Sequence, residues 1–227
     1  MTKQLNRGFR IPIEQLEDLV SDKLDGQSPT YTHVVPLRSI TKVDDLRFFK
    51  TDILEKLLRN VQLRNAEGEP AYPYQDAEIQ VYGREPSGLD PGQTFILQAK
   101  LLGIMKQLGN GIFKGYCVKG ISKMPPVRVY GEDQDRHKAV GFYFPPIVEI
   151  HQEHSALIDG IHRSYLCMTA GTTINAIHIR NVSAPLPFTP ISWENTKVAE
   201  EKPAIQDRYK NLRIDLFRDF SKIGIDG

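Results

Sequence analysis

The stretch Ala156-Leu157-Ile158-Asp159-Gly160-Ile161-His162-Arg163-Ser164-Tyr165 decides how this chain is expected to fold. Its apolar first residues predict a buried strand over 155–158, and Asp159-Gly160 predicts a turn directly after that strand. A helix is then expected from about His162 to Ala170, ended by Gly171. The sequence therefore places the start of a helix at the end of a buried strand.

The first turn of this helix combines backbone donors with three side chains that bind anions. The first N–H groups of a helix have no intrahelical acceptors, and the helix dipole adds partial positive charge there. His162, Arg163 and Ser164 lie in that turn, and the forked donors of arginine suit phosphate oxygens. The turn therefore predicts a phosphate site. In the alternative, structural interpretation, Arg163 pairs with Asp159 to lock the turn and His162 caps the strand end.

The flanking sequence predicts an α/β (α+β) fold, with a small mixed sheet and helices. Residues 147–150 and 155–158 predict a hairpin that turns at 152–154, and another strand is expected over 174–181. Thr51 is a candidate N-cap, and 131–138 is expected to be a charged loop. The remaining expected elements are helices over 11–25, 51–61, 94–108 and 205–221, and strands over 33–37, 77–83 and 127–130.

Composition restricts the classes of function. The 227 residues are 40% hydrophobic and 25% charged, with a formal net charge of +1. No global field therefore draws the protein to DNA or to an anionic membrane. No apolar run approaches the roughly 20 residues of a membrane span, and the first ten residues lack the apolar region of a secretory signal. The two cysteines, Cys117 and Cys167, form no CxxC pair, which favours the cytoplasm.

The residues around the turn resemble the ParB/sulfiredoxin superfamily. In that family, a Pro-Ile-Val strand and a hairpin strand precede a Gly-x-x-Arg or Gly-x-His-Arg turn, and the helix after the turn ends in Ala-Gly or Leu-Gly. Here Pro146-Ile147-Val148 precedes Gly160-Ile161-His162-Arg163 and Ala170-Gly171. Upstream, Val34-Val35-Pro36-Leu37-Arg38-Ser39-Ile40 is similar to the family's opening strand. The resemblance implies one ParB/sulfiredoxin-like domain over 1–227, with an insertion at about 70–141 and a helix-bearing C-terminal extension at about 183–227.

The resemblance also implies roles for individual residues. Gly160, His162, Arg163 and Ser164 would contact nucleotide phosphates, and Asp159 and His162 would be catalytic. Asp159 would then be a metal-linked or general-base carboxylate, and its alternative role is to stabilise the turn.

The turn departs from two branches of the family. Sulfiredoxins have a reactive cysteine where this chain has Ile161, so their reductase chemistry is not expected here. The CTP-binding partition proteins have Glu-Arg-Arg where this chain has Ile161-His162-Arg163. The Asp-Gly-x-His-Arg form is more similar to the free-serine kinase branch and to the DGQHR-type proteins of DNA-modification systems.

The function implied is nucleotide binding. A protein that binds ATP or CTP through its phosphates is expected, either as a Mg²⁺-dependent phosphotransferase or as a nucleotide hydrolase. The alternative is a DNA-binding module or a ParB-like nuclease of a mobile-element or DNA-modification system. The expected partners are a nucleotide and, in the alternative, DNA, with no membrane. A homodimer is an open alternative.

Other candidate sites carry less weight. No histidine pair has a metal-binding spacing, so zinc is not expected. Cys167 is expected to face the core rather than to act as a nucleophile. The basic residues between Arg128 and Lys138 could contact nucleic acid, although a solvated loop is the favoured interpretation.

Overall fold

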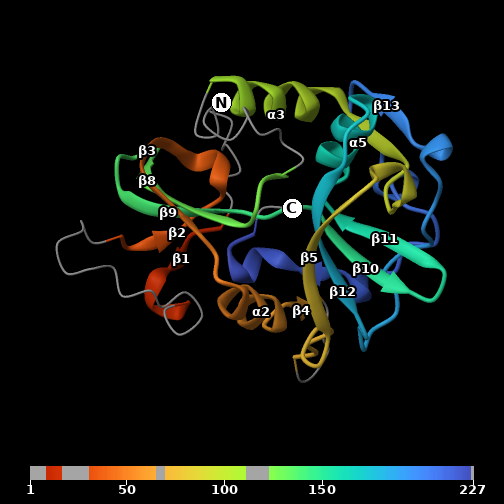
Figure 1. Cartoon of the computed structure of the whole chain (residues 1–227), viewed down its shortest axis with the longest axis horizontal. Coiled ribbons are helices and arrows are strands. Elements are labelled where there is room, and N and C mark those ends of the chain that lie inside the picture. Colours follow the sequence, from red (N-terminus) through yellow and green to blue (C-terminus); the bar gives the residue numbers. More distant parts are fainter. Residues whose placement is uncertain (1–8, 17–30, 65–69, 111–122, 226–227) are drawn as a thin grey trace. The chain divides into compact units, whose positions relative to one another are not determined.

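The computed structural model describes residues 9–16, 31–64, 70–110 and 123–225. Within these residues, mixed sheets and three α-helices confirm the predicted α+β class (Figure 1). The chain divides into two compact units, one of residues 1–62, 126–144 and 219–227, the other of residues 63–125 and 145–218. The predicted insertion at about 70–141 is thus divided between them. Among the described helices, none has both the length and the apolar character needed to cross a membrane.

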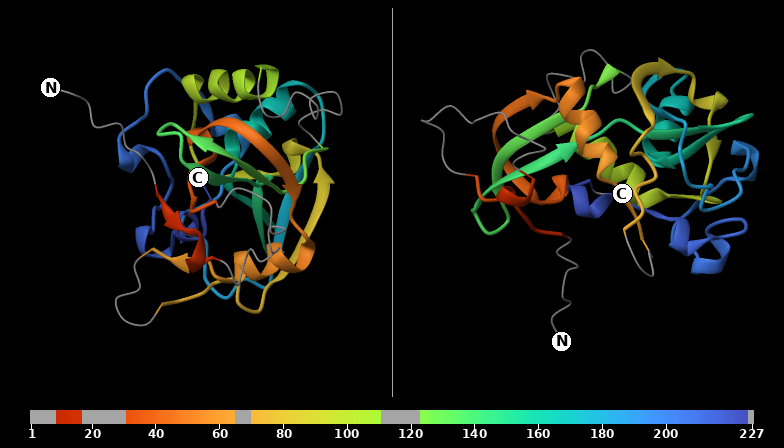
Figure 2. Two further views of the ribbon diagram at one scale, coloured as in Figure 1. Left: turned by 90° about the vertical axis from the view of Figure 1, so that its left-hand side faces the viewer. Right: turned by 90° about the horizontal axis from the view of Figure 1, so that it is seen from below.

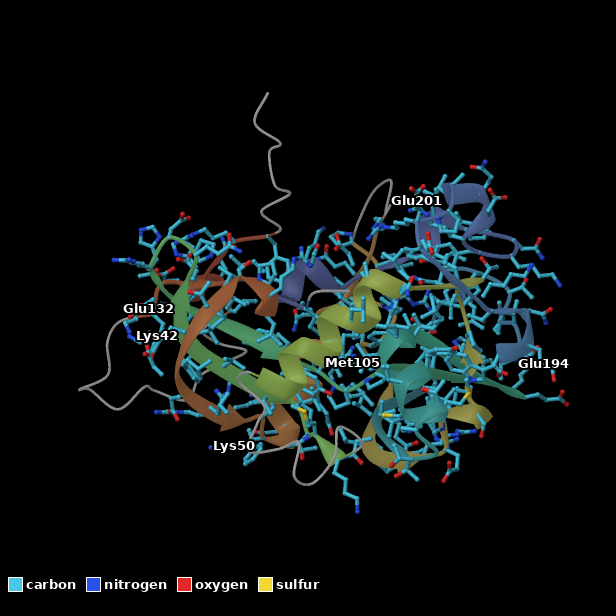
Figure 3. All side chains as sticks on the ribbon, turned by 90° about the horizontal axis from the view of Figure 1, so that it is seen from above. Lys42, Lys50, Met105, Glu132, Glu194 and Glu201 are labelled. Atoms are coloured by element: carbon cyan, nitrogen blue, oxygen red, sulfur yellow. The ribbon has the colours of Figure 1, made fainter. Side chains whose placement is uncertain are left out.

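The first unit is built on a five-stranded sheet with the order β1-β2-β9-β8-β3. β2 and β9 are parallel, and the other neighbouring pairs are antiparallel. Figure 2 shows β3 as a long curved strand beside β8. Lys42 on β3 lies opposite Glu132 on β8, and their side chains form an ion pair of 3.0 Å (Figure 3). The strands are β1 (Ile11–Pro12), β2 (His33–Val34), β3 (Ile40–Phe48), β8 (Val127–Asp133) and β9 (Lys138–Tyr143).

Helix α2 (Thr51–Arg59) also belongs to the first unit. It forms because its apolar residues recur at helical spacing, and all four of them are buried. Its N-cap residue is Lys50, and Thr51 is the first helical residue, so the predicted cap was one residue off. The buried apolar residues are Ile53, Leu54, Leu57 and Leu58.

The second unit contains a five-stranded sheet with the order β5-β12-β10-β11-β6. β10 and β11 form the predicted hairpin, and β12 lies parallel to β10. A core cluster that includes Val148, Leu157 and Ile161 joins this sheet to the helix after the turn. The strands are β5 (Glu78–Arg84), β6 (Asp90–Pro91), β10 (Ile147–His151), β11 (His154–Asp159) and β12 (Ile174–Arg180).

Two helices of the second unit lie side by side (Figure 1). Helix α5 (Ile161–Thr169) follows the turn, and helix α3 (Gln98–Asn110) follows the short strand β7 (Phe95–Leu97). β7 pairs in parallel with β13 (Lys197–Ala199). The segment 94–108 was predicted to be helical throughout, but its first residues form β7, because their backbone bonds to β13.

Further short elements are 3-10 turns at Leu37–Ser39, Pro86–Gly88 and Trp193–Asn195, and strand β4 (Gln62–Leu63).

The helix predicted over 205–221 is wrong. This segment contains 3-10 turns at Ile205–Asp207, Ile214–Leu216 and Phe220–Ile223 and the short strand β14 (Arg218–Asp219). Its backbone bonds elsewhere, since Arg208 and Lys210 accept from Thr94 and Thr189. Asn211, with a φ of 53°, also breaks helical geometry.

The helix predicted over 11–25 is not formed in its described part. Ile11–Pro12 is strand β1 and Ile13–Gln15 is a 3-10 turn, because the Ile13 N–H donates to the Thr32 carbonyl. Residues 17–25 lie outside the described part of the chain.

The predicted charged loop at 131–138 is shorter than expected, because β8 continues to Asp133 and β9 begins at Lys138.

Candidate functional site

The predicted strand, turn and helix are present around Gly160. β11 ends at Asp159 and α5 begins at Ile161. Gly160 between them has a φ of +88°, and a Cβ at this position would lie 2.8 Å from Pro146 Cα. Only glycine combines this backbone conformation with so close an approach. Any residue with a side chain at position 160 would therefore strain this turn.

The N-terminus of α5 presents backbone donors without a side-chain cap. Gly160 is the N-cap residue, and no side chain hydrogen-bonds to the helix start. The Ser164 N–H donates to the Gly160 carbonyl at 3.0 Å and makes the first backbone bond of the helix. The amides of residues 161–163 precede that bond, and they are the donors that an anion would accept from at a helix start.

Arg163 and Asp159 form an ion pair across this turn. Arg163 Nη2 donates to Asp159 Oδ2 at 2.8 Å, and the two side chains are 16% and 14% exposed. The pair matches the alternative, structural role that the sequence left open for both residues. The ion pair holds the Arg163 guanidinium at the first turn of α5 and places its positive charge beside the Asp159 carboxylate.

His162 links the start of α5 to strand β7. It is buried, and its Nε2 accepts a hydrogen bond of 3.0 Å from the Leu97 N–H. An accepting Nε2 places the proton on Nδ1. Burial, followed by the charges of Lys100 and Arg163, lowers the pKa of His162 to about 4. The ring is therefore neutral at physiological pH, and Nε2 can act as a base only by breaking its bond to Leu97.

Ser164, also predicted to contact phosphate, is completely buried. Its Oγ has no hydrogen-bond partner among the described residues. Closed off from solvent, this hydroxyl stays on the core side of α5. Of the three side chains predicted to contact phosphate, Arg163 is partly exposed, whereas His162 and Ser164 are buried.

Three cations that sequence analysis did not single out belong to the second unit, and one of them, Lys100, acts on His162 of the turn. Lys100 lies in the first turn of α3, and Lys202 and Arg208 follow β13. Lys100 contributes to the low pKa of His162, and it also acts on Lys202. No motif marks these residues, since they come from segments about 100 positions apart. Only the fold brings them together.

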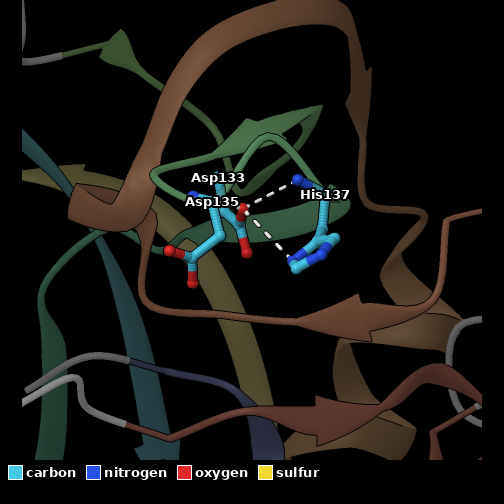
Figure 4. A group of neighbouring side chains, drawn as sticks. All are labelled: Asp133, Asp135 and His137. Atoms are coloured by element: carbon cyan, nitrogen blue, oxygen red, sulfur yellow. Dashed lines mark hydrogen bonds and ion pairs between the residues drawn. The ribbon is translucent and has the colours of Figure 1, made fainter.

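A second group of ionisable side chains lies at the hairpin between β8 and β9 (Figure 4). Ligand atoms of Asp133, Asp135 and His137 lie within 4.8 Å of one another. However, Asp133 Oδ1 already accepts the N–H groups of Asp135 and His137, both at 2.9 Å. Arg10 donates to Asp133 Oδ2 at 2.9 Å and approaches His137 Nδ1 at 3.2 Å. The guanidinium already supplies positive charge there, so we assign no metal centre.

A third group of polar side chains in the second unit centres on Glu149, which is buried together with Tyr74 and Arg218. Arg218 donates to both carboxylate oxygens of Glu149 at 2.7 and 2.8 Å, and Tyr74 Oη donates to Glu149 Oε1 at 2.6 Å. His151 Nε2 lies 2.7 Å from Glu149 Oε2. Arg218 also donates to the carbonyls of residues 184, 185 and 216. This network ties strand β10 to the C-terminal segment and has a structural role.

The remaining candidates are the cysteines and the basic stretch between Arg128 and Lys138. Cys167 is buried, and burial raises the pKa of its thiol to about 11, so it is a poor nucleophile. Cys117 lies outside the described residues. In the basic stretch, Arg128 is buried, and Lys138 pairs with Asp44 at 2.6 Å and Glu132 at 3.1 Å. Arg136 and His137 are exposed at the hairpin, and contact of this stretch with nucleic acid stays a prediction.

Comparisons with protein-family models, with curated proteins and with solved structures found no significant match to the chain. Fold and site together define an α+β protein with an uncapped helix N-terminus beside the ion pair of Arg163 with Asp159. The resemblance to the ParB/sulfiredoxin superfamily stays a prediction that rests on the residues of the turn.

Proposed function

We propose that this protein binds a nucleotide through its phosphate groups at the first turn of α5. The observation that carries the proposal is the uncapped helix start, with Arg163 held beside it. Backbone N–H groups and a guanidinium are the donors that phosphate oxygens accept from most readily. The two cysteines in 227 residues are consistent with the cytoplasm, where nucleotides are abundant.

Asp159 and His162 have binding roles in this proposal. The ion pair with Asp159 orients Arg163 before the ligand arrives, which reduces the entropy lost on binding. His162 keeps the start of α5 next to β7, and its neutral ring donates only through Nδ1. Its pKa of about 4 and its bond to Leu97 argue against general-base catalysis by Nε2.

Magnesium fits this proposal as the counterion of the nucleotide. Asp159 is the carboxylate of the turn, and one carboxylate paired with arginine is no dedicated metal cage. Mg²⁺ is commonly held by phosphates together with one or two carboxylates. We therefore expect Mg²⁺ to arrive with the nucleotide. The predicted phosphotransferase or hydrolase activity, and the alternative of DNA binding, have no further support in this geometry.

The test is a thermal-shift titration with ATP, CTP, ADP and inorganic phosphate, each with and without Mg²⁺. A ligand at about a hundredfold excess over its Kd adds roughly 2.7 kcal/mol to the free energy of unfolding. We expect a shift in the wild type that is lost in Arg163→Ala. Arg59→Ala is the matched control, since Arg59 also pairs with a carboxylate one helical turn away, Glu55 at 3.6 Å. Equal shifts in all three proteins would disprove the proposed site.

A further inference from the structure

We propose that strand β5 pairs edge to edge with β5 of a second copy of this chain, so that the sheets of two second units join into one continuous sheet. Two features of β5 carry the proposal. One edge of the strand is open, and the charges at its two ends complement each other when the strand pairs with itself in antiparallel orientation. The contact is independent of the proposed phosphate site.

β5 is an outermost strand of its sheet, with β12 on one side only (Figure 1). All seven of its residues pair with β12. Across the described residues, no other backbone hydrogen bond reaches residues 78–84. Four of the seven residues are exposed in the folded chain, among them Val81 at the centre, which is 38% exposed. The outer edge of β5 is therefore accessible to another strand.

The other three edges of the two five-stranded sheets carry features that discourage pairing with a further strand. β1 and β6 are each two residues long and contain a proline, Pro12 and Pro91. β3 has two shifts in its register with β8. Short edge strands, prolines and bulges keep sheet edges from associating. β5 has none of these features, since it contains no proline and its seven pairs with β12 run without a register shift.

The sequence of β5 is self-complementary in an antiparallel pairing that is centred on Val81. In this register, Val81 lies opposite Val81 of the second copy, and Glu78 lies opposite Arg84 of the second copy. Symmetry repeats the pair of opposite charges at the other end of the strand. Opposite charges directly across an antiparallel pair attract, and like charges repel. Because the five residues between Glu78 and Arg84 are uncharged, this register brings no like charges together.

Glu78 and Arg84 are both available for this pairing. Glu78 accepts a hydrogen bond of 2.7 Å from the Gln80 amide, and Arg84 donates to the Gly88 carbonyl at 3.1 Å. Both contacts are to neutral groups, and neither residue forms an ion pair within the described part of the chain. Each therefore has an uncompensated charge at one end of an open strand.

Packing holds β5 in place before a partner arrives. Ile79 is buried, and the Tyr82 ring stacks on buried His178 of β12 with their centroids 3.6 Å apart. A strand that is already ordered loses little conformational entropy on pairing.

A second copy of the chain suits this edge better than an unrelated extended peptide. The partner strand must carry an anion and a cation six positions apart around an uncharged centre, and β5 itself has this pattern. A twofold contact of this kind is closed, so it gives a dimer rather than a fibre. Because the contact covers a single strand, we expect a reversible dimer whose population depends on concentration.

Sedimentation velocity of the full chain over a series of concentrations tests the pairing. We expect the wild type to pass from monomer to dimer as its concentration rises. Glu78→Arg and Arg84→Glu each place like charges opposite each other at both ends of the strand, so each should weaken dimerisation by about tenfold. The double variant Glu78→Arg/Arg84→Glu restores opposite charges in the same register and should regain the dimer affinity of the wild type.

Val81→Lys tests the centre of the contact independently. Two lysines would lie opposite each other there, so the dimer should be lost. Ile205→Lys is the matched control, since Ile205 is also exposed, at 53%, and lies outside β5. Urea denaturation of each variant checks that the chain still folds.

Three results would overturn the proposal. The first is a wild type that stays monomeric at every concentration, and the second is a dimer that Val81→Lys and both single charge reversals retain. The third is a double variant that dimerises as weakly as the single reversals, since the register centred on Val81 requires it to recover. None of these results bears on phosphate binding, because no variant changes the α5 turn.

Discussion

Gly160 shows how one residue fixes the candidate site. Its φ of +88° costs an L-residue about 1–2 kcal/mol, and a Cβ would press against the Pro146 backbone at 2.8 Å. Gly160→Ala is therefore expected to lower the free energy of unfolding by about 2–4 kcal/mol in urea denaturation.

Gly171 provides the matched control for this prediction. It also has a positive φ, of +63°, but a Cβ there would meet nothing within 4 Å. Gly171→Ala should therefore cost only the conformational part, about 1–2 kcal/mol. If the two variants were equally stable, close packing against Pro146 would not be what requires glycine at position 160.

The two buried histidines, His162 and His178, predict that stability depends on pH. Burial is the main cause that lowers the pKa of each to about 4. His178 has no hydrogen-bond partner on either ring nitrogen within the described residues and stacks on Tyr82 at 3.6 Å. The Tyr82 backbone raises this pKa slightly, but its geometry falls short of a hydrogen bond.

The sign of this pH dependence follows from the number of protons that the folded and the unfolded state bind. The unfolded chain protonates these histidines near pH 6.5, and the folded chain does so only near pH 4. Between these values the unfolded state binds more protons, so the free energy of unfolding falls as pH falls. We expect a loss of about 1 kcal/mol per histidine from pH 7 to 5.5 in urea denaturation. If the free energy of unfolding of the double variant His162→Gln/His178→Gln fell as steeply with pH, the two histidines would not be the cause of the pH dependence.

At the scale of elements, sequence patterns predicted the strands and the helix around the turn closely. The hairpin of β10 and β11, helix α5 and strand β12 all lie within two residues of the predicted bounds. The predicted C-terminal helix failed because residues 208–210 bond to loops at 94 and 189. Apolar spacing in this segment is helical, but Tyr209 and Phe217 pack against Phe188 and each other. Such long-range partners are not encoded in local periodicity.

The ion pair of Glu149 and Arg218 connects the C-terminal segment to the sheet, and we expect it to contribute strongly to the stability of the fold. Both side chains are completely buried, and their carboxylate and guanidinium bond through two hydrogen bonds. Removing one partner leaves the other charge buried, so Arg218→Met is expected to cost about 3–5 kcal/mol.

A double-mutant cycle separates this pair from simple loss of packing. Glu149→Gln/Arg218→Met should be more stable than the sum of the two single changes predicts, because no unpaired charge is left buried. Additive losses in urea denaturation would argue that the pair does not interact as described. Arg213→Ala, which breaks the exposed pair with Asp215, serves as the control and should change stability little.

At the scale of the whole molecule, sequence analysis predicted the fold class and the position of the turn but missed the charge around it. Nothing in the sequence indicates that the charge of Lys100 acts on His162 at the start of α5. Lys100 and Lys202 are distant in sequence, and neither belongs to a motif. The pairing of Asp159 with Arg163 was predicted only as an alternative, because a sequence does not show which acceptor a guanidinium selects.

The central claim is that phosphate binds at the first turn of α5, and amide NMR tests it most directly. Orthophosphate and ADP would be titrated into isotope-labelled protein while the N–H signals of Ile161, His162 and Arg163 are followed. We expect these three signals to shift and saturate together, because their N–H groups would donate to the anion. The same titration in Arg163→Ala should need much more ligand. Shifts confined to other parts of the chain would contradict the claim.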